Sequence, residues 1–129
     1  MKDERGQAIV AVVVALGIAA TVIVGLRAAQ DRIVLSAREQ RAGEAAVEAA
    51  AQSVADTYAA RPAAARELVL DPRVIEAARV AAEELARENG GESVDRVELS
   101  CAGDRIEARL VLSGYSHHAG FRAPECSRR

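Results

Sequence analysis

An uninterrupted apolar run near the N-terminus constrains this chain more than any other feature. The stretch from Ala8 to Leu26 holds 19 residues without a charge, between the polar start MKDERGQ and Arg27. As an α-helix it would extend about 28 Å, which matches the hydrocarbon core of a bilayer. Because a helix in a soluble protein keeps a polar face, the run predicts a membrane span.

The pattern does not favour removal of this run by signal peptidase. That enzyme acts after an apolar region of about 7–15 residues with small residues before the cut. Here the run is longer, and the nearest small-residue site, after Ala29, has Arg27 at its third position before the cut. We therefore expect a retained anchor, and a secreted domain that loses its N-terminus is the weaker alternative.

One face of the span carries small residues. Gly17, Thr21 and Gly25 follow one another at intervals of four, so they stack along the same side of a helix. Small side chains in a membrane helix allow the backbone of a second helix to approach closely. We predict that this face makes the helix–helix contacts.

The charged residues and the cysteines predict opposite orientations of the chain in the membrane. Lys2 and Arg5 precede the span and four arginines follow within about 15 residues, a near balance that leans towards an outside N-terminus. Cys101 and Cys126, the only cysteines, predict a disulfide, which requires an oxidising compartment. We follow the cysteines and expect an extracytoplasmic C-terminal part.

The helical pattern continues beyond the span to residue 60. Residues 28–60 contain no proline and are rich in Ala, Glu, Arg and Gln, which are strong helix formers. A helix from 8 to 60 would be about 80 Å long, with Gly43 as its weak point and Pro62 as its end. Apolar residues recur at spacings of 4, 3 and 4, as a seam for a partner: Val47, Ala51, Val54 and Tyr58.

A second helix is predicted from residue 72 to 88. Asp71 can cap it, with Pro72 at its first position, and the sequence Asn89-Gly90-Gly91 stops it. Its expected apolar face consists of Val74, Ala78, Ala81 and Leu85.

The periodicity then changes to two, which predicts a β-hairpin. VDRVELSC and RIEARLVL alternate apolar and polar residues around a turn at Gly103-Asp104. This register sets Cys101 opposite Ile106, Leu99 opposite Ala108 and Val97 opposite Leu110, and brings the charges of Glu98 and Arg109 together. The tail GYSHHAGFRAPECSRR has the composition of an ordered loop.

Residues suited to catalysis or metal binding are few. His117 and His118 are adjacent, so on an extended chain they point to opposite sides, and we expect a solvated loop with no metal bound. Glu83 and Glu84 are expected to be solvated on a helix flank. There is no nucleophile, phosphate or zinc motif, and three aromatic residues offer little for nucleic acid. We expect no enzyme activity, no cofactor and no nucleic-acid partner.

The N-terminal residues ERGQAIVAV, followed by the apolar helix, resemble the TadE/TadG-like minor pilins of tight-adherence pilus systems. The resemblance implies a short charged leader that a prepilin-type leader peptidase cuts after Gly6, so that Gln7 becomes the first residue. The family's acidic residue, fifth in the processed chain, would fall at Ala11 and is absent. TadG-like relatives that stay anchored in the membrane lack it too.

These observations predict an α+β protein in four parts. They are a charged leader at 1–6, a transmembrane and stalk helix at 7–60, a linker at 61–71 and a small exported head at 72–129. The expected role is that of a minor pilin or pseudopilin, a structural subunit in the cell membrane whose partners are lipid and other pilin-like subunits. The alternative is a membrane-tethered extracytoplasmic binding module that does not assemble.

Overall fold

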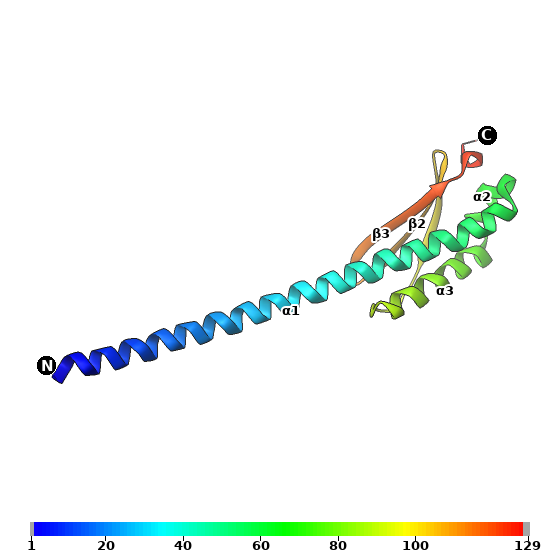
Figure 1. Ribbon diagram of the computed structural model, residues 1–129. Coiled ribbons are helices and arrows are strands. Elements are labelled where there is room, and N and C mark those ends of the chain that lie inside the picture. Colours follow the sequence, from blue (N-terminus) through cyan, green and yellow to red (C-terminus); the bar gives the residue numbers. More distant parts are fainter. Residues whose placement is uncertain (1, 128–129) are drawn as a thin grey trace. The chain divides into compact units, whose positions relative to one another are not determined.

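The computed structural model describes residues 2–127, with only the backbone described for residues 2–6. The chain divides into two compact units, Met1–Ser36 and Ala37–Arg129, and each is described here by itself. Helix α1 (Lys2–Ala60) contributes residues to both units (Figure 1). The first unit therefore consists of helix alone within the described residues, and all other elements belong to the second.

The chain leaves α1 at the predicted place. Arg61 has a non-helical backbone with φ −144° and ψ 63°, and Pro62 opens the short 3-10 helix η1 (Pro62–Ala64). Helix α2 (Ala65–Leu68) follows and buries both of its end residues. The segment 61–71, which the sequence marks as a linker, thus contains two helical turns that contribute to the core.

Helix α3 (Pro72–Glu88) has the predicted bounds and the predicted cap. The Asp71 side chain accepts a hydrogen bond from the backbone N–H of Arg73 at 2.9 Å. Val74 and Ala78 are buried as predicted. In the second half of the helix the buried face differs from the expected one, because Ala82 and Ala86 are fully buried whereas Ala81 and Leu85 are only half-buried. Alanines at intervals of four let the helix lie close to its neighbours, so the larger Leu85 lies at the side of the contact.

The sheet has three antiparallel strands in the order β1-β2-β3, namely β1 (Val97–Ala102), β2 (Arg105–Leu112) and β3 (Tyr115–Arg122). The predicted β1–β2 register is confirmed, including Cys101 opposite Ile106 and Glu98 opposite Arg109. Glu98 nevertheless forms its ion pair with Arg96, at 2.6 Å.

Strand β3 corrects the prediction of a loop in the tail. It pairs with β2 through a two-residue turn, Ser113-Gly114, in which both residues have positive φ (50° and 81°). Two positive φ values are typical of the hairpin turn whose twist matches that of the strands. His117 and His118 lie in this strand, and only His118 is exposed.

The core of the second unit lies between the sheet and two helices, α3 and the C-terminal part of α1 (Figure 1). From α1 it takes a stripe that includes Val47, Ala51 and Val54, which the sequence assigned to a partner. These residues are at most 9% exposed, and they form one cluster with the inward side chains of β1 and β2. The seam therefore packs within its own chain.

Candidate functional sites

The apolar segment of α1 is the most unusual surface of the molecule. None of its side chains from Ala8 to Leu26 is buried, and its large residues are about half to two-thirds exposed, from 54% at Val14 to 67% at Val24. Water would be in contact with apolar atoms on every side of the helix. Among the described residues, α1 is the one helix long and apolar enough to cross a membrane.

The predicted small-residue face is open in the structure. A Cβ added at Gly17 or at Gly25 would meet no atom within 4 Å apart from the neighbouring backbone of the helix itself. Thr21 donates its hydroxyl hydrogen to the Gly17 carbonyl oxygen at 2.6 Å, so the hydroxyl is satisfied within the helix. The face is thus compatible with an apolar medium and leaves room for a second backbone.

The residues of the predicted leader cut lie at the start of the same helix. Gly6 and Gln7 are both helical, and Gln7 is exposed, whereas Met1 lies outside the described residues. No side-chain contact is described before Gln7, so cleavage stays a prediction from the resemblance.

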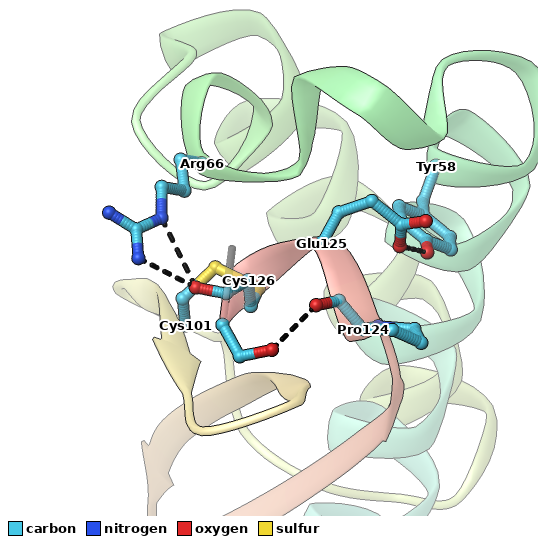
Figure 2. Close-up of a disulfide and its surroundings, with 7 residues drawn as sticks. Tyr58, Arg66, Cys101, Pro124, Glu125 and Cys126 are labelled. Carbon is cyan, nitrogen blue, oxygen red and sulfur yellow. Dashed lines mark hydrogen bonds between the residues drawn. A yellow bond between two sulfur atoms is a disulfide. The ribbon is translucent and has the colours of Figure 1, made fainter. Parts of the chain in front are cut away.

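The cysteines lie at disulfide distance, as predicted. The Cys101 and Cys126 sulfur atoms are 2.05 Å apart, and the bond joins β1 to the 3-10 helix η2 (Pro124–Cys126) (Figure 2). The described chain has no free cysteine. The disulfide therefore attaches the C-terminal segment to the first strand of the sheet.

Two further side-chain contacts, which the sequence analysis did not predict, attach the same C-terminal segment to the helices. Arg66 on α2 donates two hydrogen bonds to the Cys126 carbonyl oxygen, at 3.1 and 2.8 Å (Figure 2). Tyr58 on α1 donates its hydroxyl hydrogen to Glu125. We call Tyr58, Arg66, Glu125 and the disulfide the C-terminal clasp. No sequence spacing identifies the two hydrogen-bonded contacts, because their partners lie 67 and 60 positions apart.

His117 on β3 packs against Gly43 on α1. The His117 ring lies over the Gly43 backbone, where an added Cβ would come within 2.1 Å of Nε2. The ring is 8% exposed, so the solvated loop expected for His117 is wrong. Gly43, expected as a weak point of the helix, is instead the position that makes room for the sheet. A sequence signal for this contact is that Gly43 is the one glycine in the alanine-rich residues 28–60.

The acidic pair of α3 is likewise more organised than expected. Glu83 forms ion pairs with Arg79 at 2.6 Å and with Arg87 at 2.8 Å, and only Glu84 is fully exposed. Hydrogen bonds from Arg79 and then from Arg87 lower the pKa of the Glu83 carboxyl, and the Arg79 hydrogen bond lowers that of Glu76. These groups stabilise a helix surface and face no cavity that the structure describes.

The described residues contain no cluster of three or more His, Cys, Asp or Glu side chains that could hold a metal ion. A surface groove of about 640 Å³ runs along β1 and is lined by apolar residues of the α2–α3 corner and of β1, together with the charged residues Arg96, Glu98 and Arg109. Comparison with known proteins gives no match, since no family model, curated protein or solved structure is significantly similar to this chain. Its function is therefore argued from its own residues.

Proposed function

We propose that this protein is a membrane-anchored structural subunit, similar in role to a minor pilin or pseudopilin, which associates with neighbouring subunits through its N-terminal helix. The observation that carries the proposal is the apolar stretch Ala8–Leu26, exposed on all sides within the first unit. Lipid and other helices are the surroundings in which such a surface is stable.

Two features of the second unit support the same role. Its disulfide is typical of proteins that fold in an oxidising compartment, so the proposal places this unit on the extracytoplasmic side. The side chains of its core are mainly Ala, Val and Leu, which fill space but carry no reactive groups. A structural role needs a rigid folded unit and an anchor, and it needs no catalytic residue.

The helix-packing part of the proposal can be tested with single cysteines in the full-length protein, because the two native cysteines are bonded to each other. Thr21 lies between Gly17 and Gly25 on the small-residue face, and Ile23, two residues on, points about 200° away. In native membranes, oxidation of Thr21→Cys should give a disulfide-linked dimer, whereas Ile23→Cys should give little. Equal yields at both positions, or none at either, would contradict packing through this face.

The leader prediction has its own measurement. Membrane-extracted protein that begins at Gln7 supports cleavage of a pilin-type leader after Gly6. A chain that begins at Met1 supports a permanently anchored subunit, and a chain that begins beyond Ala28 would show a signal peptide and contradict the anchor.

The second candidate function is a membrane-tethered module that binds a partner and does not assemble. The groove along β1 favours it, since its apolar lining includes Leu70, whose side chain is 76% exposed. A module of this kind would give no Thr21→Cys dimer at native expression levels and would crosslink to a different protein through the groove.

A further inference from the structure

Both outer strands of the sheet have an edge without a neighbouring strand among the described residues. On β3 one outward backbone group, the Gly120 carbonyl oxygen, accepts a hydrogen bond from the Arg105 side chain at 2.6 Å. The sheet order places β1 and β3 at the two sides, and the backbone hydrogen bonds of the described residues include none from a further strand. In a hairpin with a two-residue turn the residues that flank the turn form a hydrogen-bonded pair, and such pairs then alternate. The N–H groups of Leu99 on β1 and His118 on β3 therefore point outward from the sheet.

The inward face of the sheet is incompletely covered at both edges. In the central strand, Ile106, Ala108 and Leu110 are at most 2% exposed. At the edges, Leu99 on β1 and Phe121 on β3 are only partly buried. An additional strand at either edge would cover apolar surface as well as satisfy backbone groups, which is the usual energetic basis of β-strand addition.

The direction of the strands restricts which strand of a second copy can pair. His117 contacts Gly43, and Phe121 stacks with Tyr58 at 5.5 Å between ring centroids, so β3 runs in the same direction as residues 43–58 of α1. Strand β1 is parallel to β3, because both are antiparallel to β2. If two copies joined their β1 edges about a two-fold axis, the two β1 strands would be antiparallel, and residues 43–58 of α1 would run in opposite directions in the two copies. If β1 instead pairs with the β3 edge of another copy as a parallel strand, residues 43–58 of α1 run in the same direction in both copies.

Charge favours the same combination. Glu98 is the one charged residue of β1, whereas β3 has no acidic residue and carries His118 and Arg122 on the same outer sheet face. Within the chain, Glu98 pairs with Arg96 and Arg122 pairs with Asp104. Two β1 strands side by side would bring two carboxylates to one sheet face, and two β3 strands would bring two guanidinium groups there. A mixed pair places charges of opposite sign on that face.

We propose that the β1 edge binds the β3 edge of a second copy of this chain as a parallel strand, so that the sheets of neighbouring subunits join. Such a contact uses two different surfaces, so it leaves one free β1 and one free β3 edge and extends into an open row. This inference deepens the proposed function, on which it rests, by assigning a second contact outside the membrane.

The first test uses a photo-crosslinking benzophenone residue in the full-length protein in its native membrane. Ser100 on β1 and Ser116 on β3 are exposed, and neither carries a side chain that the core needs. Each position should give a series of crosslinked dimers, trimers and larger species, with the Ser100 adduct located in residues 115–122 of the other copy. The exposed Glu84 on α3 is the matched control and should give none.

Other crosslinking outcomes would overturn the inference. One such outcome is that only dimers form, with the crosslink between two β1 strands. The others are that adducts form only with a different protein, or that no adduct forms. If Thr21→Cys dimers form while the sheet edges give no adduct, the inference fails and the proposed function stands. If neither contact is detected, both fail.

The second test blocks each edge separately. Leu99→Pro removes the outward N–H of β1, and His118→Pro removes that of β3, while the hydrogen bonds to β2 stay intact. Each variant alone should lose all crosslinked species, dimers included, because every contact needs both edges. Co-expressed, the two should form crosslinked dimers, since each retains the edge that the other lacks. Intact disulfide and unchanged circular dichroism establish folding, and unchanged ladders in both folded variants would overturn the proposal.

Discussion

Two parts of helix α1 are both largely apolar but have opposite surroundings. Residues 8–26 and residues 42–54 are both rich in Ala and Val, yet Val10 is 62% exposed whereas Ala46 and Val54 are fully buried. The difference lies in the charges. The second stretch places Glu44, Glu48 and Gln52 along one exposed side, and the first has no polar side of this kind. Apolar content alone therefore does not indicate a protein core, whereas its distribution around the helix does.

The largest expected effect comes from removing the exposed stretch. A chain that begins at Arg27 and is exported to an oxidising compartment should move from the membrane fraction to the soluble fraction, because the second unit contains its own core and disulfide. Fractionation and size-exclusion chromatography measure this. The matched full-length chain should require detergent. A full-length product that is monomeric in plain buffer would invalidate the membrane assignment.

Loss of the disulfide should affect only the second unit. In the chain-entropy model a cross-link over a sequence separation of 25 contributes roughly 3 kcal/mol to the free energy of unfolding. Replacing Cys101 and Cys126 together by Ser should lower stability in denaturant by about that amount. The wild-type protein treated with a thiol reductant should show the same loss, and the double variant should not respond to the reductant. Membrane association should not change in either case.

The same substitution at one glycine in each stretch of α1 tests directly whether the two stretches differ in packing. Gly43→Ala places a Cβ 2.1 Å from His117 Nε2 and should destabilise the second unit by about 1–3 kcal/mol through overpacking. Gly25→Ala meets open space and should leave the unfolding of the second unit unchanged. Adding His117→Ala to Gly43→Ala should restore part of the loss, since the ring is the group that the Cβ meets. Equal effects at both glycines would show that helix propensity, rather than packing, decides the result.

Much of the fold could be predicted from local pattern. Pro62 ends α1, Asp71 caps α3, and the alternation in VELSCA and RIEARLVL sets the β1–β2 register. Each of these depends on residues close together in the chain. Strand β3 was missed because its inward positions are His117, Ala119 and Phe121, and a histidine and an alanine do not form a clear apolar alternation.

The candidate sites divide in the same way. The apolar span and the cysteine pair are visible in the sequence, since one is a continuous run and the other uses the only two cysteines. The rest of the C-terminal clasp joins Tyr58 to Glu125 and Arg66 to Cys126, across 67 and 60 residues. For polar residues of common types at such separations, no sequence pattern indicates which residue will be the contact partner.

Local sequence patterns were enough to predict where α1 ends, where α3 begins and ends, which residues pair in the first hairpin and which stretch is apolar throughout. These properties follow from backbone preferences and from hydrophobic periodicity over a few neighbouring residues. The tertiary structure was needed to show that residues 42–54 of α1 pack within their own chain, that Ala82 and Ala86 complete the buried face of α3, and that Gly43 contacts His117. Alanine and glycine are compatible with many contacts, so the close packing of distant segments, and no local preference, selects among them.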